Sequence, residues 1–236
     1  MMPENINKQI FITFVILLSI IVFFQFTNVD IIVQEYFFNF KTNLWIWDRD
    51  EPISKLFLYS GMKKVLIVFA IFVLIILVTF YKSSLVKKYK KGMIIIVLSA
   101  IVIPFITISL KTISNTPCPK NIEHFGGDYP DIKVFDAYPK GFVQKEKIRC
   151  WPAGHASGGF ALMSLFFLFK KRKNRITALV FAVTLGWIIG TYKMIIGDHF
   201  LSHTIITMVL SWLLILIIVK IVNNFKRTEF EKSTKI

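Results

Sequence analysis

Acidic residues are scarce in this sequence, and long stretches contain no charged residue of either sign. Asp and Glu together number 14, against 29 Lys and Arg, and only 18% of the 236 residues are charged. Hydrophobic residues make up 55% of the chain and fall in blocks rather than at periods of 2 or 3.6. A soluble domain has fewer apolar residues and spreads them along its elements, so the composition excludes that class and indicates an integral membrane protein.

The apolar blocks have about the 20 residues that a helix needs to cross roughly 30 Å of hydrocarbon. We therefore predict an all-α fold, an integral membrane bundle of six transmembrane helices with an outer-face loop domain, all within a single domain over residues 1–236. The predicted spans are Gln9–Asn28, Lys63–Phe80, Met93–Leu110, Ala156–Phe169, Ile176–Ile196 and Thr204–Val222. The first lacks a strongly basic leader and an A-x-A-like cleavage site, so we interpret it as a retained span rather than a signal peptide.

Acids are missing altogether from two basic connections, 81–91 and 170–175, and the tail 223–236 is also basic at its start. Because Lys and Arg collect in cytoplasmic loops, these segments and both termini are predicted to lie in the cytoplasm. The opposite face then has the loops 29–62, 111–155 and 197–203, which contain most of the acids. Few aromatic and basic residues occur together outside the apolar blocks, so the net charge of +15 does not predict a nucleic-acid partner.

Cysteine is also scarce, and both copies lie in the predicted outer loop. Cys118 and Cys150 would face an oxidising compartment, which permits a disulfide. Closing a loop of this length contributes roughly 3–4 kcal/mol in the chain-entropy model. The pair is therefore a candidate disulfide, and the alternative is two free thiols.

All four histidines of the chain lie on the same predicted outer face, which is evidence for a site. Pro and Gly in Pro152–His155 set a turn, and the small residues that follow open a helix whose first amides can point at an anion. Lys111, at the outer end of the third span, either extends to the lipid headgroups or holds an anion. On a continuous helix His199 and His203 would share one face, so that His203 hydrogen-bonds and orients His199.

His-x3-His is also a spacing found in metal sites. Zinc takes three or four protein ligands, and no carboxylate or thiolate of this chain completes an obvious set around His199 and His203. We therefore expect no metal and no other cofactor.

Together these segments resemble the motifs of the type 2 phosphatidic acid phosphatase (PAP2) superfamily, membrane phosphatases that include lipid A and undecaprenyl-diphosphate phosphatases. The pattern of that family is K-x6-R-P, then P-S-G-H, then S-R-x5-H-x3-D. This chain has Lys111-x6-Cys118-Pro119, then Pro152-Ala-Gly-His155, then Tyr192-Lys193-x5-His199-x3-His203. The core motifs therefore cover residues 111–203.

The resemblance implies a role for each matching residue. His199 corresponds to the nucleophile that accepts the phosphoryl group as a phosphohistidine, and His155 to the general acid that protonates the leaving lipid oxygen. Lys111 corresponds to a phosphate-binding cation, and the family chemistry uses no metal. Such a transfer mainly needs positioning and positive charge around the equatorial phosphate oxygens.

Four motif positions differ from the family pattern. Cys118 replaces arginine, Ala153 serine, Lys193 arginine and His203 the aspartate that orients the nucleophile. Lysine supplies charge but not a bidentate fork, so Lys193 is a phosphate-binding candidate of weaker geometry. Three nearby residues are candidates to replace the lost hydrogen-bond donors, namely Lys120, Arg149 and Ser157. Gly154, at the predicted start of the helix, is a further phosphate-binding candidate.

We predict a membrane phosphatase that removes phosphate from a lipid headgroup of the lipid A, prenyl diphosphate or phosphatidic acid type. The resemblance places it in the inner membrane of a bacterium, with the active site facing the periplasm, and its partners are the lipid substrate and the bilayer. The alternatives are a lipid phosphotransferase using the same site and a catalytically degenerate lipid-binding protein. A transporter or channel would need ionisable residues at mid-membrane, which the predicted spans almost lack.

Overall fold

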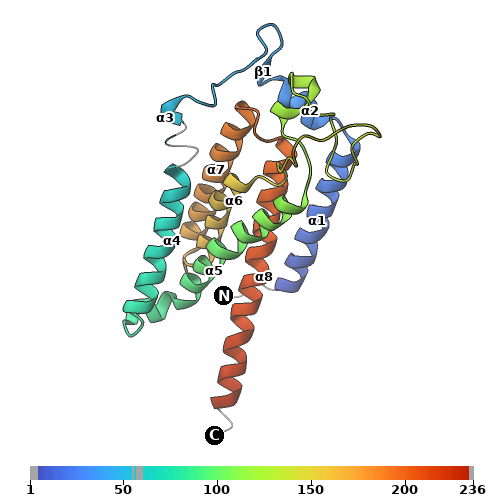
Figure 1. Ribbon diagram of the computed structural model, residues 1–236. Coiled ribbons are helices and arrows are strands. Elements are labelled where there is room, and N and C mark those ends of the chain that lie inside the picture. Colours follow the sequence, from blue (N-terminus) through green and yellow to red (C-terminus); the bar gives the residue numbers. More distant parts are fainter. Residues whose placement is uncertain (1–4, 55, 57–60, 234–236) are drawn as a thin grey trace.

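The computed structural model describes residues 5–54, 56 and 61–233, and its architecture is helical (Figure 1). Residues 55 and 57–60 of the predicted outer loop 29–62, and residues 234–236 of the predicted basic tail, lie outside this part of the chain. The longer elements are α1 (Ile6–Phe26), α2 (Val29–Glu35), α4 (Met62–Thr79), α5 (Ser84–Ile113), α6 (Gly154–Ala161), α7 (Arg172–Ile195) and α8 (Leu201–Ser233). The short ones are α3 (Pro52–Ser54), β1 (Phe38–Asn39), β2 (Leu44–Trp45) and the 3-10 helices η2 (Pro119–Asn121), η3 (Glu123–Phe125) and η4 (Leu162–Phe167).

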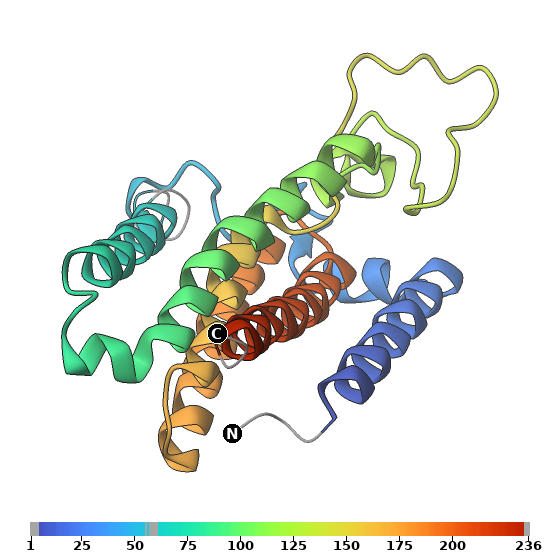
Figure 2. The same ribbon diagram turned by 90° about the horizontal axis from the view of Figure 1, so that it is seen from below.

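The helices form a bundle whose two edges are α1 and α4 (Figure 2). Helices α5, α6, α7 and α8 pack against one another in the middle, while α1 packs on α8 and α4 on α5. The core between them is made by Ile103, Ala156, Phe160, Ala182 and Ile215. Side chains on the outer surfaces of α1 and α4 are apolar and exposed, which is the surface expected of helices that face lipid.

Four helices among the described residues are long and apolar enough to cross a membrane, namely α1, α5, α7 and α8 up to Phe225. The apolar part of α4, Lys64–Thr79, is shorter. The predicted span 156–169 is α-helical only to Ala161 and then continues as η4. At 1.5 Å per residue for α6 and 2.0 Å per residue for η4, the two helices together are about 24 Å long. A helical membrane protein is confirmed, whereas the count of six spans and the outer-face loop domain stay predictions.

Helix α5 begins earlier than the sequence predicts. The basic run 87–91, assigned to a connection, forms the first turns of a 30-residue helix that begins at Ser84. Lysine is a good helix former, so the helix continues beyond the apolar block that marked it in the sequence. At the other end of the molecule, α5 stops at Ile113, where the outer loop begins.

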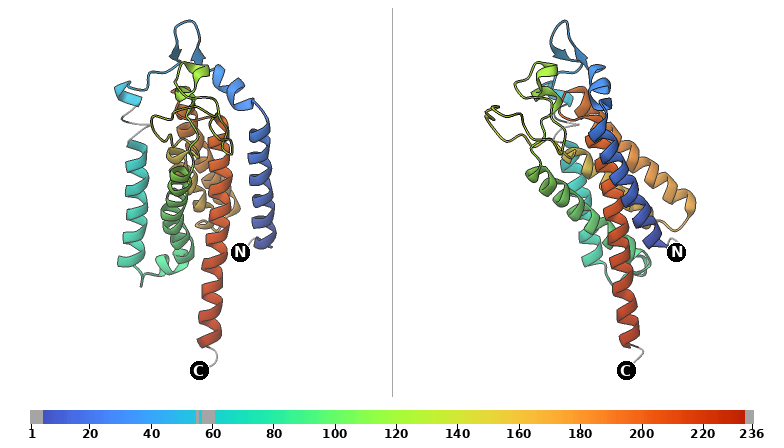
Figure 3. Two further views of the ribbon diagram at one scale, coloured as in Figure 1. Left: turned by 45° about the vertical axis from the view of Figure 1, so that its right-hand side comes forward. Right: turned by 90° about the vertical axis from the view of Figure 1, so that its right-hand side faces the viewer.

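The connections at one end of the bundle pack into a cap (Figures 1 and 3). It contains α2, the hairpin β1–β2, η2, η3 and the long loop that ends at α6. The strands pair antiparallel with Phe38 opposite Trp45, and both rings pack on Phe125 of η3. The described chain begins and ends at the opposite end of the bundle, and α8 extends beyond the other helices there (Figure 3).

Helices α6 and α7 approach each other at glycines, with direct consequences for the site. A Cβ atom on Gly159 would lie 2.8 Å from the Cα of Gly186, closer than side chains tolerate. The two backbones are therefore in contact, which brings the start of α6 with His155 near the end of α7 with Lys193. The glycines thus help to bring two motifs separated in sequence toward each other.

Candidate active site

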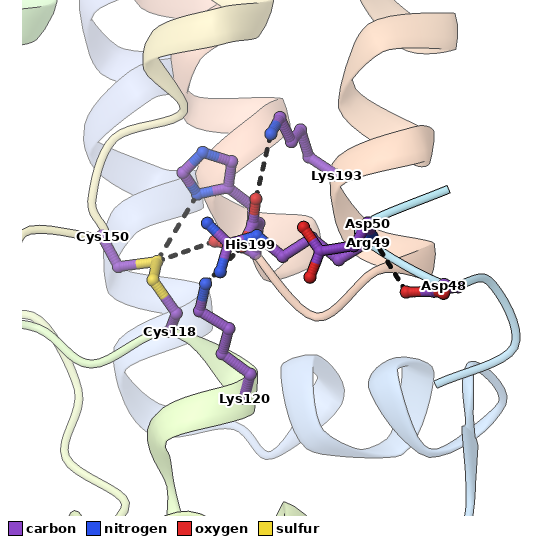
Figure 4. Close-up of polar contacts among 9 residues, drawn as sticks. Asp48, Arg49, Asp50, Cys118, Lys120, Cys150, Lys193 and His199 are labelled. Carbon is purple, nitrogen blue, oxygen red and sulfur yellow. Dashed lines mark hydrogen bonds and ion pairs between the residues drawn. A yellow bond between two sulfur atoms is a disulfide. The ribbon is translucent and has the colours of Figure 1, made fainter. Parts of the chain in front are cut away.

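A disulfide joins Cys118 to Cys150 across 32 residues, with their Cα atoms 5.2 Å apart. The Cys150 N–H also donates to the carbonyl of Thr116, so the two ends of the loop are held together twice. Figure 4 shows the bridge next to His199. The bridge therefore couples the end of α5 and η2 to the segment that leads into α6.

We expect thiol labelling of the native protein to fail until a reductant is added. Replacing both cysteines by serine is expected to lower the free energy of unfolding by about 3–4 kcal/mol, the chain-entropy contribution for a loop of this size. Alkylation followed by mass spectrometry checks the first statement, and thermal unfolding in detergent with and without reductant checks the second. Ready labelling of both cysteines without reductant would contradict the bridge.

His199 lies in the turn between α7 and α8, and its side chain is buried. Its N–H and that of Asp198 both donate to the carbonyl of Lys193, which closes the end of α7. Nδ1 of His199 is 3.4 Å from Nδ1 of His203 and 3.6 Å from Sγ of Cys150. His203 is in α8, whereas His199 precedes that helix in the turn, so the two rings meet without lying on one continuous helix.

The contact between the imidazoles bears on which nitrogen can react. When Nδ1–H of His199 donates to Nδ1 of His203, Nε2 of His199 keeps its lone pair for attack. Burial, followed by the charges of His203, Lys111, Lys193 and His155, lowers the pKa of His199 well below its ordinary value. His199 is thus a neutral imidazole near pH 7, the form that a nucleophile requires.

Asp198, the neighbour of His199 in the chain, is the centre of an ion cluster. Its Oδ2 is 2.9 Å from Nζ of Lys193, and its Oδ1 is 2.8 Å from Nζ of Lys120 and 3.7 Å from Nε of Arg49. Burial would raise the pKa of the Asp198 carboxyl, but the charges of Lys193 and Lys120 hold it below its usual value. The carboxylate therefore fixes the side chains of Lys193 and Lys120 next to the imidazole.

A largely apolar groove of about 470 Å³ runs between α4, α5 and α6. Its polar lining comes from Lys111, His155, Ser157 and Ser164, and the rest comes mostly from aliphatic side chains such as Leu66 and Ile101. The Lys111 side chain runs beside Gly154, because a Cβ atom on that glycine would be 4.0 Å from Cδ of Lys111. The groove thus combines a cation and a histidine with walls suited to hydrocarbon.

The start of α6 is held by a hydrogen bond from the Ala153 N–H to Oγ1 of Thr207 on α8. His155 is in the first turn and only half-buried. Ser157 is buried, and its hydroxyl donates to the carbonyl of Gly154, so its proton is directed to the backbone of its own helix. This helix start presents His155, while the contribution of Ser157 is to the turn itself.

Two comparisons bear on this arrangement. The sequence pattern of the PAP2 superfamily matches residues 92–227, which is more than half of the chain and includes every motif discussed above. The chain belongs to the PAP2 superfamily. This confirms the resemblance drawn from the motifs.

One curated protein is similar to this chain over most of its length. The chain is 28% identical over 192 residues, covering 78% of this chain and 82% of the relative, to a protein named lipid A 4'-phosphatase from Francisella tularensis subsp. novicida (strain U112). No solved structure matches the chain. The relative supports a position in the lipid A phosphatase-like branch of the PAP2 superfamily.

Several PAP2 motif positions meet in the structure, and one candidate does not. The ring of His199 contacts that of His203, and Asp198 pairs with both Lys193 and Lys120. The adjoining groove is lined by Lys111, Gly154 and His155. Arg149 is exposed and forms no ion pair with any residue that the structure describes. Asp198 and Arg49 were not recognised as site residues in the sequence, because their partners lie up to 149 positions away and follow no periodic pattern.

A second carboxylate lies behind His203. Asp30, in α2, accepts a hydrogen bond of 2.8 Å from the Ser202 N–H, and a cavity of about 40 Å³ is lined by Asp30, Thr116 and His203. Burial raises the pKa of Asp30 to about 6. The hydrogen bonds of this carboxyl go to Ser202, the neighbour of His203 in the chain.

Among the described residues, Cys150, His199 and His203 form one group whose ligand atoms lie within 4.8 Å of one another. Sγ of Cys150 is bonded to Cys118, so it is not a thiolate. The two remaining imidazoles are fewer than the three or four protein ligands that zinc takes. This donor set does not fit a zinc site.

Proposed function

We propose that this PAP2 protein is a lipid phosphatase that works through a phosphohistidine at His199 without a metal. The observation that carries the proposal is the buried, neutral His199, oriented by His203 and surrounded by Lys111, Lys193 and His155. A reactive nitrogen next to several cations is what phosphoryl transfer to an imidazole requires.

In the proposed reaction Nε2 of His199 attacks phosphorus, forming the P–N bond as the P–O bond to the lipid breaks. His155 gives its proton to the leaving lipid oxygen. A water molecule then attacks the phosphohistidine, His155 takes up a proton from that water, and inorganic phosphate leaves with His199 restored. His203 serves as the orienting partner, in the place of the family aspartate.

The cations have a separate role in this proposal. Lys111, Lys193 and Lys120 would offset the charge on the equatorial oxygens as the phosphoryl group passes between its two partners. Lys193 is only 1% exposed and paired with Asp198, so its ammonium is held in position before the substrate arrives. Preorganised charge of this kind costs no rearrangement during the reaction.

A lipid substrate is supported by the groove beside Lys111 and His155. An acyl or prenyl chain would lie against its aliphatic walls while the headgroup phosphate meets the cations. The relative named lipid A 4'-phosphatase favours a lipid A-type headgroup, and prenyl diphosphate and phosphatidic acid are the other candidates.

We further propose that the protein lies in the inner membrane of a bacterium as one domain, with the site facing the periplasm and both termini in the cytoplasm. The basic segments 87–91 and 170–175 support this orientation by the positive-inside bias. The disulfide supports it independently, because the periplasm is oxidising.

The test is phosphate release by the purified protein in detergent, offered lipid A, undecaprenyl diphosphate and phosphatidic acid in turn. We expect release from at least one of them, with little change in rate after treatment with EDTA. Mass spectrometry of membrane lipids with and without the gene identifies the natural substrate. Transfer of the phosphate to a second lipid would indicate a phosphotransferase, and binding without turnover a degenerate lipid-binding protein; either result would overturn the proposal.

A further inference from the structure

The two positions where the PAP2 pattern has arginine do not provide a guanidinium in this chain. Cys118 is in the disulfide, and Lys193 is a buried ammonium paired with Asp198. A guanidinium presents a rigid fork that binds two phosphate oxygens at once, which an ammonium does not. These two motif positions thus supply charge but no guanidinium fork.

Strand β2 packs directly on the turn that carries His199. The Trp45 ring lies against Gly197, where a Cβ atom would collide with the indole ring. Gly197 also has φ of +73°, so glycine is favoured there by both space and backbone. Trp45 packs in turn on Phe38 and Phe125, which ties the hairpin to the rest of the cap.

From this seat the chain brings Arg49 into the ion cluster, four residues after Trp45. Nε of Arg49 is 3.7 Å from Oδ1 of Asp198, the same oxygen that pairs with Lys120. Figure 4 shows the Arg49 side chain extending from its segment toward Lys120 and His199. The side chain is 45% exposed, whereas that of Lys193 is 1% exposed, so Arg49 is the member of the cluster most open to an incoming headgroup.

The charges around Asp198 favour an anion at this position. Three cations, Arg49, Lys120 and Lys193, lie around the single carboxylate of Asp198, next to the imidazole of His199. At 3.7 Å the contact between Arg49 and Asp198 is longer than a hydrogen bond and half-exposed, and such ion pairs are weak. A phosphate that replaces this contact would therefore displace only a weak ion pair with Asp198.

We infer that Arg49 is a phosphate-binding residue of this active site, supplying from the outer cap the guanidinium that positions 118 and 193 lack. This inference rests on the proposed phosphatase function and adds a residue to it. Arg49 would bind the headgroup phosphate from the exposed side of the ion cluster, and Lys193 would bind it from the buried side.

The test compares Arg49→Gln, Arg49→Lys and Arg49→Ala with the wild-type protein in detergent. The matched control is Lys140→Gln, which removes an exposed cation from the outer loop, where Lys140 forms no ion pair with described residues. We expect kcat/KM to fall by about 10- to 100-fold in Arg49→Gln, because a charge-assisted hydrogen bond is lost, and only part of this loss in Arg49→Lys. Lys140→Gln is expected to stay within about twofold of wild type.

Chemical rescue separates binding from a structural role. Added guanidinium at millimolar concentration is expected to raise the rate of Arg49→Ala but not that of wild type or Lys140→Gln. Size-exclusion profiles show which variants fold. If Arg49→Gln and Arg49→Ala do not fold, kcat/KM of Arg49→Lys is compared with that of wild type instead. An Arg49→Gln rate within about twofold of an active wild type would overturn the inference while leaving the phosphatase function intact.

If wild type releases no phosphate from any lipid offered, the proposed function fails on its own, and binding of inorganic phosphate decides the role of Arg49. Calorimetry is then expected to show about tenfold weaker binding of phosphate by Arg49→Gln than by wild type. Equal affinities would overturn the inference.

Discussion

Replacing His199 by alanine is expected to abolish phosphate release from a lipid phosphate, with a loss of about 1,000-fold or more, because the attacking nitrogen is removed. The ring is buried beside its orienting partner His203, so the variant leaves a void but no unpaired charge. Initial rates of phosphate release by the purified protein measure the loss. Reactions with labelled substrate, quenched in alkaline denaturant because the P–N bond of a phosphohistidine is acid-labile, are expected to show a phosphoenzyme in wild type and none in the variant.

A matched control for this variant is His124→Ala. His124 lies in the same cap with an exposed ring 2.8 Å from Glu35, and we expect its removal to change the rate by less than about twofold. Full activity in a folded His199→Ala protein would exclude the phosphohistidine mechanism.

The pH profile should carry the signature of the lowered pKa of His199. Because its pKa lies below the ordinary value, the imidazole stays neutral as the pH falls from about 8 to about 6, and the nucleophile is not lost by protonation in that range. A rate that declines through this range should therefore be traced to another group in the site. A profile that titrates with His199 itself, followed by NMR of the labelled ring, would contradict the assignment.

The second large effect is expected for His155→Ala, with a loss of about 100- to 10,000-fold on a lipid phosphate, the range for removing a general acid. The lipid oxygen is a poor leaving group and needs a proton. A nitrophenyl phosphate has a leaving group that departs without one, so its hydrolysis is expected to lose much less. Rates for both substrates, measured on the same preparation, give the comparison.

The two substrates also serve as the internal control for His155→Ala, since a misfolded site would lose both activities alike. Equal losses would therefore assign His155 a role in binding or folding rather than proton donation. The half-buried position of His155 at the edge of the groove is compatible with a proton exchange with water between turnovers.

Much of the fold was predictable because a helix that crosses the hydrocarbon of a bilayer needs a continuous block of apolar residues, which the sequence shows directly. Apolar blocks gave α1, α4, α7 and the apolar part of α8 to within a few residues. The early start of α5 was missed because hydropathy marks the hydrocarbon, not the helix, and lysines continue a helix into water. The switch of α6 to η4 left no signal in hydropathy.

The site was predictable to the extent that its residues follow a local pattern. His199 and His203 are four apart, and the motif spacings placed Lys111 and His155 beside them. Asp198 and Arg49 were not predictable as partners, because 149 residues separate them and they approach each other where Trp45 packs on Gly197. Interactions that depend on how loops pack on one another leave no periodic mark in a sequence.

The groove between α4 and the α5–α6 pair has a consequence for how such an enzyme would be measured. A substrate whose tails lie in this groove reaches the site by diffusing sideways within the bilayer, so it need not pass through water. Its effective concentration is then the number of substrate molecules per membrane lipid rather than per litre. Diluting the substrate with inert lipid should slow the reaction, while diluting the vesicles with buffer should leave each turnover unchanged.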